Sequence, residues 1–288
     1  MPREVLAYLD PQPGATIVDC TAGAGGHLRL IAEAMGRGRI VGLDRDPVAL
    51  ALAGAQSLPA GVRVDLLHSD FRHTGERLRE LGIEQVDGVM ADLGVSSMQL
   101  STAQRGFSFA ADGPLDMRMD PRQPLTAHEV VNQFDERTLA DLIFQFGEER
   151  RSRRIARAIV RSRPLHTTAQ LAGVVAAVSR SVNPKGRRGL HPATRTFQAL
   201  RIVVNAEIDA LTDWLTLLPT WLRPGGRAVV ISFHSLEDRP VKQSFRAGAD
   251  QGVYELLTRR TVRPSEDEMA RNPRSRSAKL RAVRRLAV

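Results

Sequence analysis

The chain is poor in cysteine, and this scarcity excludes several kinds of site. Its 288 residues include one cysteine, Cys20, so an intramolecular disulfide and a cysteine-rich zinc site are both ruled out. The seven histidines form no His-x-x-x-His pair, which argues against a structural metal site. We therefore expect no metal, and we expect Cys20 to be a small buried hydrophobe in the first strand.

Long apolar runs are missing as well. No run approaches the ~18 residues that a membrane span requires, and the N-terminus has no secretory apolar region. We therefore expect a cytoplasmic protein that has no membrane partner. The content of hydrophobic residues, 42%, and of charged residues, 25%, is ordinary for a globular protein, and the length suits one large domain with an insertion, or two domains.

Acidic residues are outnumbered by basic ones. The chain has 41 Lys and Arg against 32 Asp and Glu, a formal net charge of +9 and a sequence pI of about 10.9. Arginine supplies nearly all of the positive charge, and its guanidinium suits phosphate recognition. Because many basic proteins bind no nucleic acid, the clustering of the arginines decides this question.

The stretch from Thr16 to His27 has the pattern of a strand, a tight turn and a helix. A β-branched run ends in Asp19, glycines follow at positions 23, 25 and 26, and apolar residues then recur at helical spacing. This is the opening unit of a nucleotide-binding α/β sheet, in which the helix N-terminus offers N–H groups to an anion.

Two cofactors compete for this turn. A dinucleotide would place its pyrophosphate there, but the carboxylate of Asp19 would repel it. The same carboxylate can accept hydrogen bonds from the ammonium of S-adenosylmethionine, whose carboxylate the amides of residues 25–27 could hold. Asp44, at the end of the next strand, can bind the ribose hydroxyls of either cofactor. The methyl donor is favoured, and an ordinary turn that binds nothing is the plain alternative.

The first hundred residues alternate strands with helices, which predicts a mostly parallel sheet covered on both faces. Strands are expected at Thr16–Cys20, Arg39–Asp44, Val62–Leu67 and Val86–Asp92. Each strand brings an acid to its carboxyl end: Asp19, Asp44, Asp70 and Asp92. Ligands of such sheets bind beyond these strand ends.

Helix signals dominate from about residue 102 to residue 190. Thr126 with Glu129 and Thr167 with Gln170 have the spacing of capping boxes, while Asp135 can begin a helix that Gly147 ends. A long helix over 193–218, a turn at 223–226 and a strand at 227–233 follow. Residues 253–261 and 278–286 are expected to pair as an antiparallel ribbon. The predicted division is 1–101 and 192–288 for the sheet domain, with an all-helical insertion at 102–191.

Further motifs are more specific than the glycine turn. They are Ala91-Asp-Leu-Gly-Val-Ser-Ser97, Arg105-Gly-Phe-Ser-Phe109, Gly113-Pro-Leu-Asp-Met-Arg-Met119, His191-Pro-Ala-Thr-Arg-Thr-Phe-Gln-Ala-Leu-Arg201 and Ser232-Phe-His-Ser-Leu-Glu-Asp-Arg239. In these motifs and in their order, over nearly the whole chain, the sequence resembles the bacterial small-subunit ribosomal RNA cytosine-N4 methyltransferases, the MraW or RsmH family.

The resemblance implies a class I, Rossmann-like, S-adenosylmethionine-dependent methyltransferase sheet with a helical insertion. It implies S-adenosylmethionine as the methyl donor and a cytosine in the decoding region of 16S rRNA as the acceptor, within the small ribosomal subunit. The family's cofactor positions match Gly25, Gly26, His27, Asp44, Phe71, Asp92 and Gln99. The family usually has a histidine-containing segment before the glycine loop that this chain lacks, so we expect either a start further upstream or a missing N-terminal cover of the cofactor.

Several of these residues also have a structural interpretation. Phe71 can face adenine or fill the core, and Asp70 can accept from the adenine amino group or cap a helix. Methyl transfer requires alignment more than acid–base help, and an acceptor near the cytosine amine would receive its proton. Asp92 and His234 are the two candidates, although Asp92 can instead orient the cofactor and His234 can cap a turn. Methylation at carbon 5 normally needs a cysteine adduct, so the single cysteine disfavours it.

Basic side chains cluster in three places that suit RNA. Arg150, Arg154, Arg157 and Arg161 follow helical spacing and fall on one face, while Lys185, Arg187 and Arg188 form a basic loop, as do residues 271–276. A solvated charged face is the alternative for the helix alone. Together the clusters favour phosphate contacts whose affinity falls with salt.

Other functions remain open at this point. The chain can be a methyltransferase of another RNA or of protein, or a ribosome-assembly factor that binds the cofactor without turnover. A nicotinamide dehydrogenase is disfavoured by Asp19.

Overall fold

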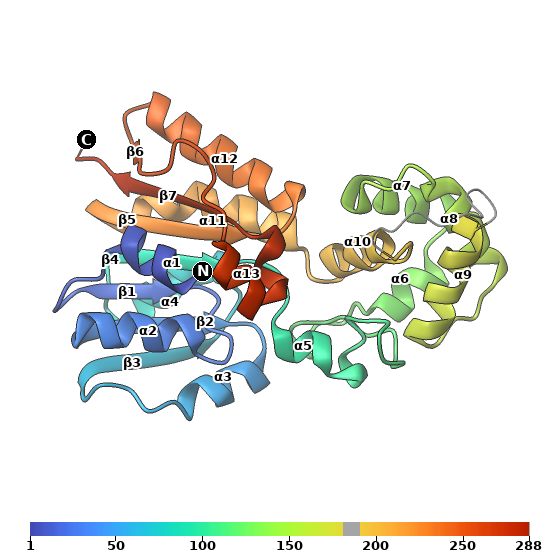
Figure 1. Cartoon of the computed structure of the whole chain (residues 1–288), viewed down its shortest axis with the longest axis horizontal. Coiled ribbons are helices and arrows are strands. Elements are labelled where there is room, and N and C mark those ends of the chain that lie inside the picture. Colours follow the sequence, from blue (N-terminus) through green and yellow to red (C-terminus); the bar gives the residue numbers. More distant parts are fainter. Residues whose placement is uncertain (181–190, 288) are drawn as a thin grey trace. The chain divides into compact units, whose positions relative to one another are not determined.

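Contacts divide the chain into two compact units in the computed structural model, which describes residues 1–180 and 191–287 (Figure 1). The first unit contains residues 1–94 together with those from 208 on, and the second spans Val95–Glu207. The second unit is wider at both ends than the predicted insertion at 102–191.

A seven-stranded sheet forms the centre of the first unit. Its strand order is β3-β2-β1-β4-β5-β7-β6, in which the first five strands are parallel and β7 runs antiparallel to both of its neighbours. The bounds are β1 (Thr16–Asp19), β2 (Arg37–Asp44), β3 (Gly61–His68), β4 (Val86–Asp92), β5 (Leu222–Ser232), β6 (Tyr254–Leu256) and β7 (Lys279–Arg285). The predicted parallel sheet and the predicted C-terminal ribbon are both confirmed.

Helices cover both faces of this sheet because each strand sends alternate side chains into two separate cores. Ile17 packs in one core with residues of α1 (Pro2–Leu9), α2 (Gly26–Met35) and α3 (Pro47–Gly54). Its neighbour Val18 packs in the other core, with residues of α4 (Thr74–Glu80), α11 (Glu207–Trp221) and α12 (Ser235–Asp250). The short α13 (Glu266–Arg271) precedes β7. None of the helices in the described part of the chain combines the length and the apolar character needed to cross a membrane.

The second unit is helical around a core of its own. Its helices are α5 (Ser97–Ser101), α6 (Ala127–Gln133), α7 (Glu136–Gly147), α8 (Ser152–Arg161), α9 (Thr168–Arg180) and α10 (Thr194–Val204). The capping boxes of Thr126 with Glu129 and of Thr167 with Gln170 are both formed, and Asp135 caps α7 as predicted.

The prediction of one long helix over 193–218 is wrong. The chain forms α10 and then α11, and Asn205 and Ala206 separate them. The side chain of Asn205 accepts from the Met119 amide at 2.7 Å and donates to the Met117 carbonyl at 2.8 Å, and Ala206 has a φ of 47°. A contact 86 residues away in sequence therefore interrupts a pattern that is helical throughout.

At two glycine-containing sites the structure differs from the prediction: the end of α7 and the turn at 223–226. Gly147 is the last residue of α7, but Glu148 takes the left-handed conformation at the helix end, with a φ of 49°. A Cβ on Gly147 would lie 2.7 Å from the Arg195 carbonyl oxygen, so glycine is required there for packing against α10. The turn predicted at 223–226 lies within β5, where the register with β4 shifts and Gly225 has a φ of 82°.

Candidate active site

Carboxylates stand at the ends of three adjacent parallel strands in the first unit. β1 ends at Asp19, β2 at Asp44 and β4 at Asp92, and the sheet order places β1 between the other two. The glycine turn begins directly after Asp19. The carboxyl ends of these strands and the glycine turn therefore lie together on one side of the sheet, as the sequence predicts.

Asp19 is fully buried and only partly satisfied. Its Oδ1 accepts from the Thr21 amide at 3.1 Å, whereas its Oδ2 has no hydrogen-bond partner among the residues that the structure describes. Burial raises the pKa of Asp19 from 3.8 to about 6, and the charge of His27 and the Thr21 amide oppose this only in part. A buried carboxylate oxygen without a donor is costly unless a ligand supplies one.

His27 and Asp92 face each other beside Asp19. His27 Nε2 lies 3.6 Å from Asp92 Oδ2, while His27 Nδ1 and Asp92 Oδ1 are buried without a partner in the described part of the chain. Burial lowers the pKa of His27, but the hydrogen bond and charge of Asp92 outweigh it, so the net pKa is raised. The Asp92 amide donates to Thr21 Oγ1 at 2.6 Å, which ties β4 to the turn after β1.

The glycine turn leaves two amides available at the start of α2. Gly25 has a φ of 87°, and a Cβ there would lie 3.2 Å from the Ala53 Cα, so the turn requires glycine. The Gly25 amide donates to the Ala22 carbonyl at 2.8 Å, and its contact with the cofactor stays a prediction. The amides of Gly26 and His27 open the helix and donate to no described residue, so the two of them can bind an anion.

Asp44 supports the glycine turn directly. Its Oδ2 accepts from the Gly23 amide at 2.7 Å and its Oδ1 from the Asp46 amide at 2.8 Å. Burial raises the pKa of Asp44, and these two amides oppose the rise. A ribose hydroxyl that binds Asp44 would therefore donate to a carboxylate oxygen that already accepts from a backbone amide. The sequence alone does not predict this second role of Asp44.

Asp70 and Phe71, which follow β3, both form contacts within the protein, and their contacts with adenine stay a prediction. Asp70 accepts from the Arg72 amide at 2.9 Å, which confirms it as a cap, and it forms an ion pair with Arg45. Phe71 is half-buried, with its ring edge-on to Trp214 at 6.1 Å between centroids, and the Arg45 guanidinium lies 5.9 Å from the ring centroid.

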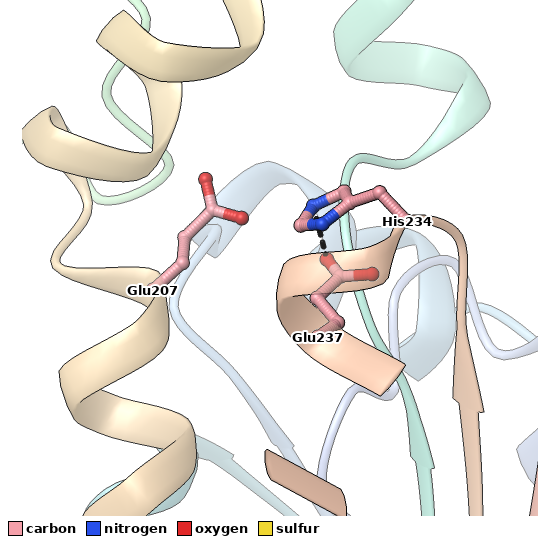
Figure 2. A group of neighbouring side chains, drawn as sticks. All are labelled: Glu207, His234 and Glu237. Carbon is pink, nitrogen blue, oxygen red and sulfur yellow. Dashed lines mark ion pairs between the residues drawn. The ribbon is translucent and has the colours of Figure 1, made fainter. Parts of the chain in front are cut away.

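His234 follows β5 and begins α12. Its Nε2 lies 3.0 Å from Oε1 of the buried Glu237 (Figure 2). The other carboxylate oxygen of Glu237, Oε2, accepts from the Phe233 amide at 2.8 Å. His234 holds the N-cap position of α12, although its side chain forms no cap bond to the helix backbone, so its role in the site stays a prediction. Glu207, also drawn in Figure 2, belongs to the second unit and holds Arg201 through two contacts of 2.8 Å.

Cys20 is buried at the start of the turn and is not a nucleophile at neutral pH. Its Sγ lies 3.7 Å from Thr74 Oγ1, and burial raises its pKa to about 12. The predicted burial of Cys20 is confirmed, although Cys20 directly follows β1 and does not lie in the strand.

The remaining cofactor candidate, Gln99, lies in the second unit. It is buried in α5 and forms a capping box with Ser96, through contacts of 2.9 and 3.1 Å. Its contact with the cofactor stays a prediction.

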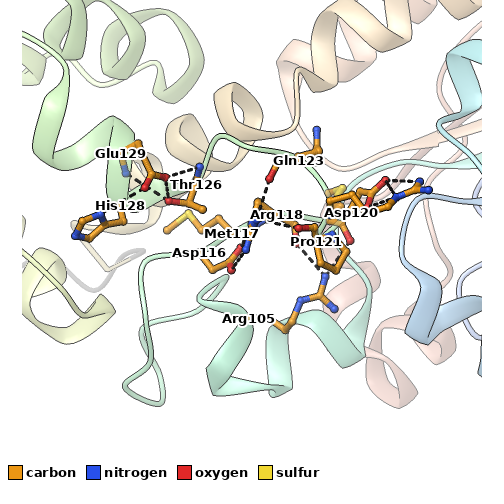
Figure 3. Close-up of polar contacts among 12 residues, drawn as sticks. Arg105, Asp116, Met117, Arg118, Asp120, Pro121, Gln123, Thr126, His128 and Glu129 are labelled. Atoms are coloured by element: carbon orange, nitrogen blue, oxygen red, sulfur yellow. Dashed lines mark hydrogen bonds and ion pairs between the residues drawn. The ribbon is translucent and has the colours of Figure 1, made fainter.

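A polar network holds the loop before α6 in the second unit (Figure 3). Arg118 binds Asp116 through two contacts of 2.9 Å and donates to the carbonyls of Pro121 and Gln123. Arg105 in turn donates to the Arg118 carbonyl at 2.9 Å. Arg105 and Arg118 come from two of the motifs quoted above, and the network joins these two segments of the loop.

The predicted basic face of the second unit is exposed. Arg154, Arg157 and Arg161 project from α8, and Arg150 precedes the helix; the opposite side, with Ile155 and Ile159, is buried. Arg157 also pairs with Glu136 at 3.2 Å. Lys185, Arg187 and Arg188 lie outside the described residues.

Comparisons with known proteins find relatives over nearly the whole chain. The model of the MraW methylase family matches residues 1–286. The chain is 53% identical to "Ribosomal RNA small subunit methyltransferase H" of Koribacter versatilis, over 98% of this chain and 92% of the relative. It is 50% identical to the protein of the same name from a Cyanothece species, over 99% and 92%. A solved rRNA methylase from Streptococcus thermophilus is 10% identical, with a TM-score of 0.45 over 100% of this chain and 98% of the other.

Proposed function

The chain belongs to the MraW methylase family, and we propose that it transfers a methyl group from S-adenosylmethionine to the N4 amino group of a cytosine in 16S rRNA. The observation that carries the proposal is a set of buried polar atoms at the carboxyl ends of the strands that have no hydrogen-bond partner among residues 1–180 and 191–287: Asp19 Oδ2, His27 Nδ1 and Asp92 Oδ1. We further propose that the substrate is the small subunit or its precursor, in the cytoplasm.

The residues present fit the methyl donor. Asp19 Oδ2 offers a buried acceptor to an ammonium, and the amides of Gly26 and His27 offer donors to a carboxylate. Asp44 stands at the end of the adjacent strand for the ribose, and Phe71 offers its ring to adenine. A dinucleotide is disfavoured because the pyrophosphate would meet Asp19, whose anionic form predominates above pH 6.

The donor supplies an electrophilic methyl group on a sulfonium. What the chain must add is alignment and a place for the proton that leaves the cytosine amine. Asp92 Oδ1 is a candidate acceptor because it is buried and has no described partner. His234 is the second candidate, and its contact with Glu237 would stabilise the imidazolium that forms.

The single cysteine favours methylation of cytosine at N4 over methylation at carbon 5. A carbon-5 methyltransferase needs a cysteine thiolate, but the pKa of Cys20 near 12 keeps this thiol protonated. The exposed arginines of α8 and the basic segments at 185–188 and 271–276 would hold the RNA backbone, in which case the affinity falls with salt.

Isotope transfer tests the proposal. The enzyme is incubated with immature small subunits and a donor that carries a labelled methyl group, and the rRNA nucleosides are separated and identified by mass spectrometry. We expect the label in N4-methylcytosine. Label in 5-methylcytosine would contradict the proposal, and tight donor binding without any labelled nucleoside would favour a non-catalytic assembly factor.

A further inference from the structure

A small pocket lies between α12 and the β6–β7 ribbon, on the sheet domain and outside the strand-end site. Lys242 and Arg246 reach it from α12, Arg259 from the segment after β6, and Arg281 from β7, with Phe245 and Thr258 completing its wall. Its volume is about 40 Å³. Because a single water needs roughly 10–15 Å³ of such space, the pocket has room for a few waters or for the oxygens of one phosphate group.

Four cationic side chains therefore meet at one cavity, and only one has an anionic partner. Arg281 Nε lies 2.7 Å from Asp238 Oδ1, and Asp238 also lies 3.6 Å from Lys279. Lys242, Arg246 and Arg259 form no ion pair with any residue in ranges 1–180 and 191–287. Like charges so placed repel one another unless an anion lies between them.

Buried contacts hold one wall of the pocket together. The pair of Arg281 with Asp238 joins β7 to α12, and both side chains are largely buried, at 12% and 15% exposed. Thr258 is buried as well, and its Oγ1 accepts from the Ala282 amide at 2.9 Å. Lys242, Arg246 and Arg259 are exposed, so the cations at the mouth of the pocket can reach a ligand that is part of a long polymer.

We propose that this cationic pocket (Lys242, Arg246, Arg259 and Arg281) binds a phosphate group of the RNA backbone. The inference rests on the proposed RNA methyltransferase function, and it adds a contact on the sheet domain to those expected on α8. A phosphate fits because a guanidinium group can bind it through bidentate hydrogen bonds. The pocket is also open to solvent on the side of the exposed cations, so a phosphate of a long polymer can reach it. Such a phosphate contact positions the RNA strand but does not distinguish one base from another.

The test is a double variant, Lys242→Gln with Arg246→Gln, which leaves Arg281 and its pair with Asp238 in place. The control is Arg3→Gln with Arg29→Gln, which removes two exposed charges from α1 and α2. Affinity for a small-subunit rRNA fragment is measured at several salt concentrations. We expect the pocket variant to bind several-fold more weakly at low salt and to reduce the slope of log affinity against log salt by about 0.7 to 0.9, the value for one lost phosphate contact. The control keeps the wild-type slope, and donor affinity and melting temperature stay unchanged in both.

Two results would overturn the inference. One is an equal loss in the control, which would mean a general effect of charge. The other is an unchanged slope in the pocket variant, and if calorimetry then shows inorganic phosphate binding to the wild type, the pocket serves a free anion and not RNA. Failure of the proposed function is seen separately, as wild-type protein that binds the fragment with the expected slope but methylates no ribosomal substrate.

Discussion

Replacing Asp19 with asparagine is expected to stabilise the free protein and weaken its binding of the methyl donor. Asp19 is fully buried, and its Oδ2 has no partner among the described residues, so its negative charge is costly until a cation arrives. Asparagine keeps an acceptor for the Thr21 amide and removes the charge. Stability and binding should therefore change in opposite directions, which a generally damaging substitution would not produce.

The size of the gain follows from the pKa of Asp19. A rise from 3.8 to about 6 corresponds to about 3 kcal/mol, since one pKa unit is about 1.4 kcal/mol. The asparagine NH2 would stand where Oδ2 lacks a partner, which costs about 1 kcal/mol. The net gain is therefore about 2 kcal/mol. For donor binding, loss of a hydrogen bond between two charged groups, worth about 1.5–3 kcal/mol, predicts a roughly ten- to hundredfold weaker affinity.

The contribution of Asp19 to stability should change with pH in a definite direction. The folded state raises the pKa of Asp19, so ionisation penalises folding: the penalty is complete above pH 6 and disappears as the pH falls toward 3.8. The advantage of Asp19→Asn should thus be full at pH 7.5 and small at pH 4. Wild-type donor affinity should fall below pH 6 more steeply than that of the variant, which lacks the titration of Asp19 but keeps His27 and Asp44.

Urea unfolding at both pH values and calorimetry of donor binding measure these effects. Asp213→Asn on α11 is the matched control, because Asp213 is exposed and its loss should change neither quantity. A variant less stable than wild type at pH 7.5, or one with unchanged donor affinity, would refute the reasoning.

Three further outcomes are expected. Asp44→Ala should weaken donor binding roughly ten- to hundredfold by calorimetry, from loss of the ribose contact and of the Gly23 support, and an unchanged affinity would remove Asp44 from the site. Arg154→Gln with Arg157→Gln should spare donor binding but lower the salt slope of RNA affinity by about 0.7 per lost contact, and an unaltered slope would leave α8 outside the RNA interface. Gly147→Ala should lower the free energy of unfolding by about 1–3 kcal/mol, because its Cβ would lie 2.7 Å from a carbonyl oxygen of α10; a loss under 0.5 kcal/mol in urea would show that the contact relaxes easily.

The sheet could be predicted from the sequence because its strands are short apolar runs that end in acids. Asp19, Asp44 and Asp92 mark three strand ends correctly, and parallel strands bring such ends to one edge. Asp19 could also be chosen as a ligand for a cation, although the family's cofactor positions did not select it. Its burial, and with it the raised pKa, could not be known from local sequence.

Contacts between distant segments account for what the sequence did not predict. The break between α10 and α11 depends on Asn205, which binds the backbone of a loop near residue 118. The support of the glycine turn by Asp44 depends on the register of β2 beside β1. The cationic pocket combines residues from α12, β7 and the segment between β6 and β7, which no single motif contains.

A crystal structure of the protein with S-adenosylmethionine tests the central claim most directly, because it shows which atoms meet the donor. The account predicts that the ammonium donates to Asp19 Oδ2, that the carboxylate accepts from the amides of Gly26 and His27, and that Asp44 holds the ribose. A donor bound elsewhere, or one whose ammonium faces away from Asp19, would contradict it.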